Sequence, residues 1–441
     1  MDEVQVIGAG LAGCEAAYQL QKRGCRVALF EQKPLAKSKA HVLDGFAELV
    51  CSNSLKSTDL ATAGGLLKAE LQHLDCLLLR LAKECSVAAG SALAVDRIKF
   101  SQLVTNTIVK YPLITLHNQI VQEFDLTKPT IVATGPLTSG ALANQISGLV
   151  EGFLNFFDAV SPIVEFDSID MSCAFVQDRY DKHSEVEQSI SMEGDYINCP
   201  LDFEQYQLFY QQLLGADRVQ PKEWEGIKYF DSCMPIEVIA SRGQDTMRFG
   251  PLRPVGFVDP ITMKRPYAVL QLRKENTLGN IYNLVGFQTN LKFGEQKRVF
   301  GLVPALKNAE YVRYGVMHRN SFVNAPLVLD RHFALKKYSN IYIAGQLSGL
   351  EGYVESIMSG LIAGISMSNR LRCKPQMILP ETTMIGALTD YVTRPNKNYA
   401  PMNANFGILP PLTGNKSKQE RKRLYSQRAL NEMNKIVANG G

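Results

Sequence analysis

Two of the nine cysteines lie in segments whose composition suits a reactive thiol. Cys51 lies in an irregular polar stretch close to Lys56, and Cys233 lies in a polar break that precedes Arg242 and Arg248. A nearby cation stabilises the thiolate, which is the nucleophilic form of cysteine. At either position, however, local composition alone favours a structural cysteine over a nucleophile. The cysteines contain no Cys-x-x-Cys pair, which argues against a disulfide framework and against structural zinc.

A glycine-rich turn near the N-terminus offers a site for a dinucleotide. The apolar run Val4–Ile7 predicts a buried strand that leads into Gly8-x-Gly10-x-x-Gly13 and a helical segment. In this pattern the glycines permit the tight turn, the approach of backbone to a pyrophosphate, and close packing of helix on strand. A second strand, over 26–30, ends in a carboxylate placed to bind a ribose hydroxyl. The expected contacts are Gly8, Ala9, Gly10, Leu11, Ala12, Gly13 and Glu31.

Two later strand ends favour FAD over NAD as the tightly held dinucleotide. Residues 129–135 and 339–345 each read as a buried strand ending in glycine. Gly135 and Gly345 resemble the later contact points of two-part flavoprotein folds. A glycine-rich loop and a helix of small residues follow Gly345, and the first turn of that helix would direct N–H dipoles toward the electron-rich edge of a flavin ring. A junction with a packing role alone is the alternative interpretation.

The bulk composition, 46% hydrophobic and 20% charged, is that of a soluble globular protein. No apolar run approaches the length of a membrane span, and the N-terminus enters a strand without room for a signal peptide, so we expect a cytoplasmic protein without membrane contact. A net charge of +4 does not by itself indicate nucleic-acid binding, which would need local basic patches. The six histidines are scattered, and no metal site is expected.

The chain is too long for one hydrophobic core, so more than one domain is expected. We predict an α/β fold in which residues 1–150 and 325–441 form a discontinuous, Rossmann-like FAD-binding domain. An α+β domain of residues 151–324 is inserted between them and is expected to bind substrate. Leucines at near-helical spacing predict one helix over 64–85. The basic stretch 416–435 also reads as a helix, with either a solvated charged face or a contact to an RNA backbone.

Several unusual strings resemble the folate- and FAD-dependent RNA (uracil-5-)-methyltransferases. The resemblance runs from the first strand to past residue 407, so it covers nearly the whole chain. Two of the strings contain Cys51 and Cys233. The strings are residues 8–13 (GAGLAG), 46–55 (FAELVCSNSL), 92–97 (ALAVDR), 133–139 (ATGPLTS), 233–237 (CMPIE), 314–320 (YGVMHRN), 351–356 (EGYVES) and 401–407 (PMNANFG).

The resemblance implies transfer of a methylene group from 5,10-methylenetetrahydrofolate, through reduced FAD, to C5 of a uridine. NADPH or NADH would supply the electrons. The implied uridine lies in the T-loop of tRNA or, as in a relative of the family, in 23S rRNA. Cys233 is implied as the nucleophile on C6 of uracil and Cys51 as the base or a second essential thiol, although the two roles are exchangeable. A tRNA-wobble-modification flavoprotein and an NAD(P)H-dependent flavin oxidoreductase without RNA stay open as alternatives.

The sequence departs from the family pattern near the expected folate site and before the Cys51 loop. Asn290 stands where the family can carry His, and Phe293 where it can carry Trp; a carboxamide stacks less well on a pterin than an imidazole does. Residues 38–44 are also off the pattern. These departures leave room for a changed RNA target or weakened folate use. Basic walls around a flipped-out base are expected among Lys56, Arg97, Arg242, Arg248, Arg253, Lys264, Arg265 and Lys292.

Overall fold

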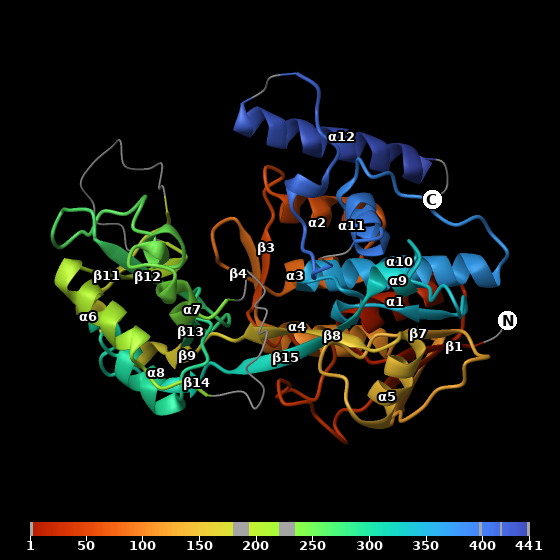
Figure 1. The fold of residues 1–441 in the computed structure, drawn as a ribbon, viewed down its shortest axis with the longest axis horizontal. Helices are drawn as coiled ribbons and strands as arrows, with labels where there is room; N and C mark the ends of the chain where they lie inside the picture. Colours follow the sequence, from red (N-terminus) through yellow and green to blue (C-terminus); the bar gives the residue numbers. More distant parts are fainter. Residues whose placement is uncertain (1–2, 180–193, 220–233, 397–398, 415–416, 439–441) are drawn as a thin grey trace.

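The computed structural model of the chain describes residues 3–179, 194–219, 234–396, 399–414 and 417–438. Within these ranges the chain forms a mixed α/β fold with two large hydrophobic cores. The elements around one core come from both ends of the chain, and those around the other come from its middle (Figure 1). The expected boundaries at 150/151 and 324/325 stay predictions.

A parallel five-stranded sheet lies at the centre of the larger core. Its strands, from edge to edge, are β16 (Ile341–Ile343), β7 (Thr130–Val132), β1 (Val4–Ile7), β2 (Val27–Glu31) and β6 (Ile114–Asn118). Strands β16, β7, β1 and β2 are almost wholly buried, as expected for a parallel sheet covered on both faces. The chain leaves β1 toward β2 on one side, whereas β7 lies on the other side. Strand order therefore reverses at β1, where ligands of open α/β sheets bind.

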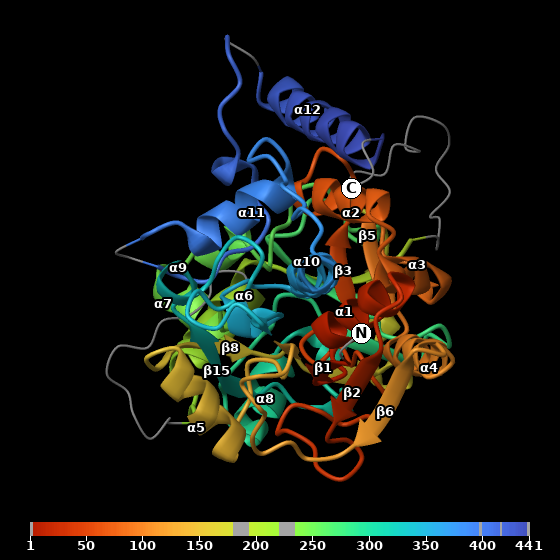
Figure 2. The same ribbon diagram turned by 90° about the vertical axis from the view of Figure 1, so that its right-hand side faces the viewer.

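Helix α1 (Leu11–Lys22) packs along α10 (Tyr353–Leu371), although more than 300 residues separate them in the chain (Figure 2). A Cβ on Gly360 would lie 2.1 Å from the carbonyl oxygen of Ala12, and one on Gly364 would lie 2.8 Å from that of Ala16. Both distances are too short for a side chain. The small residues noted in the sequence therefore let the two helices approach closely beside the glycine-rich turn.

Smaller elements surround this sheet. The single helix predicted over 64–85 is wrong, because the chain breaks around Asp75, whose φ is +54°. The buried Glu15 carboxylate explains the new start: it accepts hydrogen bonds from the N–H groups of Leu77 and Leu78 at distances of 3.3 and 3.0 Å. The elements are β3 (Ser54–Ser57), α2 (Ala63–His73), α3 (Leu77–Glu84), β4 (Ser86–Val87), β5 (Ala92–Val95), α4 (Arg97–Ile108), α5 (Gly140–Leu149), α9 (Ala325–Val328), α11 (Met384–Thr393) and α12 (Lys418–Ala438).

The middle of the chain forms a six-stranded antiparallel sheet with helices packed against it. The strand order is β10 (Phe175–Val176), β11 (Tyr196–Leu201), β12 (Ala268–Lys274), β13 (Ile281–Leu284), β9 (Ile163–Glu165) and β14 (Tyr311–Arg313). The helices are α6 (Phe203–Leu214), α7 (Ile236–Ser241) and α8 (Phe293–Phe300). An antiparallel ribbon of β8 (Phe153–Ala159) and β15 (Met317–Val323) connects this sheet to the parallel one (Figure 1). We refer to the described residues between 163 and 313, which form this sheet and its helices, as the inserted part.

Among the helices of the described ranges, none combines the length and the apolar character that a membrane span needs. The described cysteines are free thiols. Within the same ranges, no three His, Cys, Asp or Glu side chains gather as they would around a metal ion. The cytoplasmic location stays a prediction.

Candidate active site

The carboxyl ends of β1, β7 and β16 meet and form the framework of the candidate site. Gly8 follows β1 with a φ of +100°, and a Cβ at this position would lie 2.6 Å from the carbonyl oxygen of Ala133. A Cβ on Gly13 would lie 1.7 Å from the carbonyl oxygen of Gly8. Gly345 follows β16 with a φ of +79°, and a Cβ at this position would lie 3.3 Å from the methyl group of Ala12. Residues predicted from three distant motifs therefore lie together.

Glu31 fixes the shape of the glycine-rich turn. It ends β2 and is buried, and its Oε2 accepts the N–H of Ala9 at 2.8 Å while Oε1 accepts the N–H of Lys33 at 2.9 Å. A carboxylate can accept about four hydrogen bonds, so both oxygens keep capacity for a ribose hydroxyl. The structure thus gives this carboxylate a role in holding the turn that the motif alone did not indicate.

Gly10 provides the sharpest test of whether FAD fits. Its φ of −76° and ψ of −168° suit any residue, and apart from Gly10 and its chain neighbours no atom of the described residues lies within 4 Å of an ideal Cβ at this position. Neither the backbone nor internal packing therefore requires glycine here. The position forms an open cradle, which a Cβ would fill, at the N-terminus of α1, where a pyrophosphate binds. Gly135, with a φ of +77°, is similarly open. The predicted residues therefore fit FAD.

The loop that carries Cys51 crosses over this turn. The N–H of Ala47 donates to the carbonyl oxygen of Ala9 at 3.0 Å. The N–H groups of Cys51 and Ser52 both donate to the hydroxyl oxygen of Tyr353, at 2.6 and 3.0 Å. Tyr353 is the first residue of α10, and burial, with a contribution from Cys51, raises its pKa. The half-buried Cys51 thus lies between the glycine-rich turn and the start of α10, as a site built from both motifs requires.

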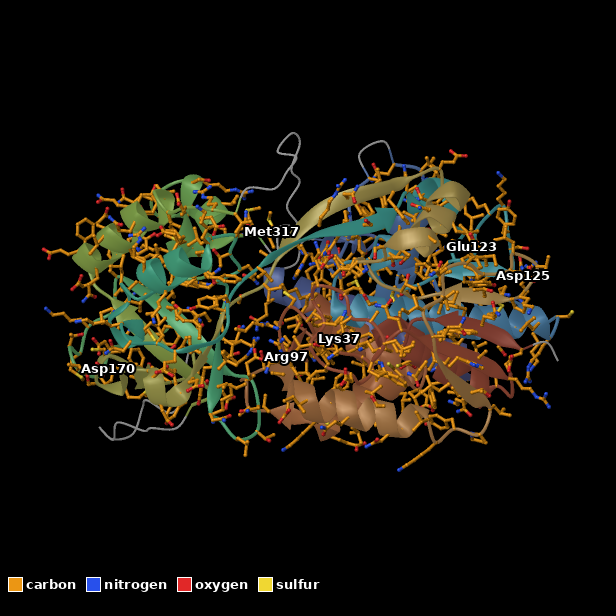
Figure 3. All side chains as sticks on the ribbon, turned by 90° about the horizontal axis from the view of Figure 1, so that it is seen from below. Lys37, Arg97, Glu123, Asp125, Asp170 and Met317 are labelled. Carbon is orange, nitrogen blue, oxygen red and sulfur yellow. The ribbon has the colours of Figure 1, made fainter. Side chains whose placement is uncertain are left out.

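Two arginines, one from each side of the junction with the inserted part, hold the carbonyl groups that precede Cys51. Arg97, the first residue of α4, donates to the carbonyl oxygen of Leu49 at 3.0 Å, and Arg313 of β14 donates to that of Val50 at 3.1 Å. Glu275 lies 2.7 Å from Nε of Arg97, and both side chains are at most 11% exposed. Burial, with the charge of Arg97, lowers the pKa of Arg313 to about 10, so it stays protonated at neutral pH. Two cations thus face one carboxylate beside this loop, at the junction where Arg97 is labelled in Figure 3.

Comparison with known proteins places this site in a family. The profile of the family described as glucose inhibited division protein A (GidA) matches residues 3–375. A protein of Acetivibrio thermocellus named methylenetetrahydrofolate–tRNA-(uracil-5-)-methyltransferase TrmFO is 51% identical over 444 residues, covering 99% of each chain. The protein of that name from Listeria innocua is 50% identical over 437 residues, covering 98% of each chain. The chain belongs to the TrmFO methyltransferase family.

The solved structure of GidA from Aquifex aeolicus has the same fold as this member of the TrmFO family. It matches with a TM-score of 0.70 at 15% identity, over 98% of this chain and 76% of that one. The predicted α/β fold class is therefore confirmed. The family resemblance seen in the sequence strings is confirmed as well, by relatives that align over nearly the whole chain.

Cys233, the other thiol predicted from the TrmFO strings, lies outside the described residues. The segment that follows it is well anchored: Met234 is buried, and the N–H of Ile236 donates to the carbonyl oxygen of Gln288 at 2.7 Å. The buried carboxylate of Glu237 accepts the N–H of Asn290 at 2.7 Å. The CMPIE segment and the segment around Asn290 are therefore neighbours. The roles of Cys51 and Cys233 stay predictions.

The two departures from the family pattern have different surroundings. Asn290 is buried, and its amide donates to the carbonyl oxygen of Val219 at 2.6 Å, so its side chain supports the local fold. Phe293 is 53% exposed and stacks on Tyr314, with ring centroids 4.8 Å apart. Tyr314 in turn stacks on Tyr311 at 4.8 Å. The replaced aromatic position therefore still presents a flat apolar face.

Most of the basic residues expected as walls have other surroundings. Arg248 pairs with Asp245 at 2.7 Å and lies 3.6 Å above the ring of Tyr267, and Lys292 pairs with Asp217 at 2.9 Å. Four more are exposed on the inserted part: Arg242, Arg253, Lys264 and Arg265. Of the set, the structure brings Arg97 to the Cys51 loop and Lys56 to the first turn of α10, where Lys56 lies 3.3 Å from a carboxylate oxygen of Glu355.

Sequence reasoning singled out neither Tyr353 nor Arg313, although Tyr353 stands inside a quoted string. A third such residue, His41, hydrogen-bonds Ser38 at 2.6 Å in the loop that follows Glu31. Burial, with the charge of Lys33, lowers the pKa of His41 to about 4, so the imidazole is neutral at physiological pH. For His41 the sequence did contain a signal, because residues 34–60 form a long irregular connection and such connections tend to be functional.

Proposed function

We propose that the protein is a methyltransferase that forms 5-methyluridine in tRNA, with 5,10-methylenetetrahydrofolate as the carbon source and FAD as the bound cofactor. The observation that carries this function is the position of Cys51. Its loop contacts both the glycine-rich turn, through Ala47, and the first turn of α10, through Tyr353. A thiol at the mouth of a dinucleotide site, in a chain half identical to enzymes named for this reaction, matches the chemistry of C5 methylation.

That chemistry assigns tasks to the side chains of the chain. C5 of uracil is a poor nucleophile until a thiolate adds to C6, which forms a sulfur–C6 bond and places electron density on C5. After C5 gains the one-carbon group, a base removes the C5 proton and the sulfur–C6 bond breaks. We assign the addition to Cys233 and the proton transfer, or a second thiol function, to Cys51. Bound FAD, reduced by NADPH or NADH, supplies the carbon carrier and the two electrons that take methylene to methyl.

The uridine must leave its stack to reach this site, because the reacting carbon is not accessible inside a folded RNA loop. Arg97 and Arg313 bind backbone carbonyl groups of the Cys51 loop and so hold this loop in place for the flipped-out uridine. The T-loop uridine of tRNA is the proposed target, since the methyltransferase relatives are named for tRNA. The alternatives of 23S rRNA, wobble modification and a flavin oxidoreductase without RNA gain no support from these names.

The decisive experiment is methylation of unmodified tRNA transcripts with methylenetetrahydrofolate and NADPH, with and without added FAD. Cys51→Ala and Cys233→Ala are each expected to abolish formation of 5-methyluridine while the protein stays yellow. Cys373→Ala, at an exposed cysteine on the chain surface, is the matched control and should keep full activity. Full activity in Cys51→Ala or Cys233→Ala would remove that thiol from the mechanism. Methylation of 23S rRNA fragments in place of tRNA would overturn the choice of substrate.

A further inference from the structure

The C-terminal helix α12 carries a concentrated positive charge at its beginning. Residues 416–428 contain six Lys or Arg residues and one acidic residue, Glu420. Arg421 and Arg423 are exposed, and among the described residues no carboxylate forms an ion pair with either. We propose that the first two turns of α12 bind the phosphate backbone of the RNA substrate, outside the active site. This inference rests on the proposed function and extends it to a second RNA contact.

The rest of α12 is already occupied in holding the helix on the protein. Tyr425, Ala429 and Met433 are buried along one face, which packs on α2. Ser426 donates to the carbonyl oxygen of Leu60 at 2.6 Å, and Asn434 hydrogen-bonds His73 at 3.1 Å. α12 therefore runs parallel to α2, and its basic turns lie beyond the beginning of α2. A rigidly anchored helix holds its exposed cations in fixed positions, as a backbone contact requires.

The anchoring also gives the direction and reach of the basic turns. Leu60, which Ser426 contacts, follows Cys51 by nine residues through β3, so the two positions are at most about 30 Å apart. Arg423 and Arg421 lie three and five residues before Ser426, or roughly 4 to 8 Å along the helix axis. One turn of a B-form DNA duplex covers about 35 Å, and one turn of an RNA duplex is of the same order. An RNA arm with its target base at Cys51 can therefore extend its backbone to these arginines.

RNA is the partner that the surface favours. The apolar face of α12 is buried against the protein, so an amphipathic insertion into a membrane surface is not available to it. Figures 1 and 2 show α12 as the outermost helix on the side of α2 and α11. α12 lies beyond residue 375, where the match to the GidA profile ends, and within the length shared with the tRNA methyltransferases. Cations at the start of a helix also add to its positive dipole end, which favours an anionic partner.

The test measures tRNA binding and methylation by the full-length holoenzyme. The variant Arg421→Glu/Arg423→Glu is compared with Lys83→Glu/Lys110→Glu, which changes two exposed lysines of the parallel-sheet part and removes the same charge. If each arginine neutralises one phosphate, the slope of log Kd against log salt should fall by about 0.7 to 0.9 per residue, or roughly 1.5 in total. KM for tRNA should rise at least tenfold with kcat unchanged, whereas the control should keep the wild-type slope.

A flavin absorbance spectrum and a thermal unfolding midpoint equal to the wild type's establish that the variant is folded. If the glutamates unfold α12, Arg421→Gln/Arg423→Gln takes their place, with the same expected loss of slope. A wild-type slope and KM in the folded variant, or an equal loss in the control, would overturn the assignment. Failure of the wild type to methylate any tRNA would instead overturn the proposed function, so the two failures are distinguishable.

Discussion

Gly10 and Gly13 belong to one motif, but the structure predicts opposite consequences when each is replaced by alanine. At Gly13 a Cβ would lie 1.7 Å from the carbonyl oxygen of Gly8, in the tight junction between β1 and α1. At Gly10, apart from its chain neighbours, no atom of the other described residues lies within 4 Å of the added carbon, and the backbone conformation suits alanine. Gly13→Ala should therefore prevent folding of the parallel-sheet part, whereas Gly10→Ala should leave the apoprotein folded.

The size of each effect follows from these contacts. Replacing glycine by alanine in a compatible conformation stabilises a protein by about 0.4–1 kcal/mol. A methyl group in the space needed by the pyrophosphate acts as overpacking, which costs about 1–3 kcal/mol. Because about 1.4 kcal/mol corresponds to a tenfold change, FAD should bind Gly10→Ala roughly 5- to 150-fold more weakly. The clash at Gly13 is much more severe than ordinary overpacking and should yield insoluble or unfolded protein.

The assay is urea unfolding of the FAD-free proteins, followed by titration of FAD monitored through flavin fluorescence. We expect Gly10→Ala to equal or exceed the wild type in its free energy of unfolding and to lose FAD affinity. If FAD bound Gly10→Ala as tightly as the wild type, the pyrophosphate would not approach this turn and our placement of the cofactor would be wrong. A soluble, FAD-binding Gly13→Ala would contradict the packing argument.

Two further predictions concern buried carboxylates. Burial raises the pKa of Glu70 from its ordinary value of 4.5 to about 8. The stability that depends on the neutral Glu70 carboxyl is therefore fully present below about pH 4.5 and is lost progressively as the pH rises through 8. Relative to Glu70→Gln, the wild type should lose on the order of 4 kcal/mol of unfolding free energy between pH 5 and 8. Urea titrations at the two pH values measure this, and a difference in unfolding free energy between wild type and variant that did not change with pH would refute it. Glu275→Gln leaves Arg97 buried without its carboxylate and should cost about 3–5 kcal/mol. Glu432→Gln, which breaks the exposed pair with Lys435, should cost less than about 1 kcal/mol, and equal losses in the two variants would contradict the burial argument.

The parts of the fold that the sequence predicted are those in which a short motif fixes its own geometry. Gly8 adopts a φ of +100° at the end of β1, where the motif requires a tight turn. Gly135 and Gly345, each at a strand end, likewise have positive φ values. In such places the residue type and the local backbone determine each other, so no knowledge of distant contacts is needed. The strand β1 therefore begins and ends as predicted, at Val4 and Ile7.

Where distant residues decide the structure, the sequence was less informative. The leucine periodicity over 64–85 is continuous, but the chain breaks at Asp75. There Tyr18, which precedes it by 57 residues, donates to its carboxylate at 2.8 Å, and Glu15 caps the helix that follows. The spacing of the leucines indicates which face of a helix is buried, but it carries no information about a cap supplied by a distant residue. Local sequence patterns likewise cannot predict the hydrogen bond between the Cys51 N–H and the Tyr353 hydroxyl, because the two residues are 302 positions apart.

The Cys51 loop illustrates why the inserted part matters to chemistry on the FAD-binding side. Asn53, two residues after the thiol, is buried; it donates to the carbonyl oxygen of Lys274 at 2.8 Å and accepts from Arg273 at 3.0 Å. Arg313 donates to the carbonyl oxygen of Val50 on the other side of the thiol. The inserted part therefore holds the backbone on both sides of Cys51. Each buried hydrogen bond of this kind contributes about 1 kcal/mol or more. A shift of the inserted part would therefore displace the Cys51 thiol before it disturbed the glycine-rich turn, because Glu31 holds that turn.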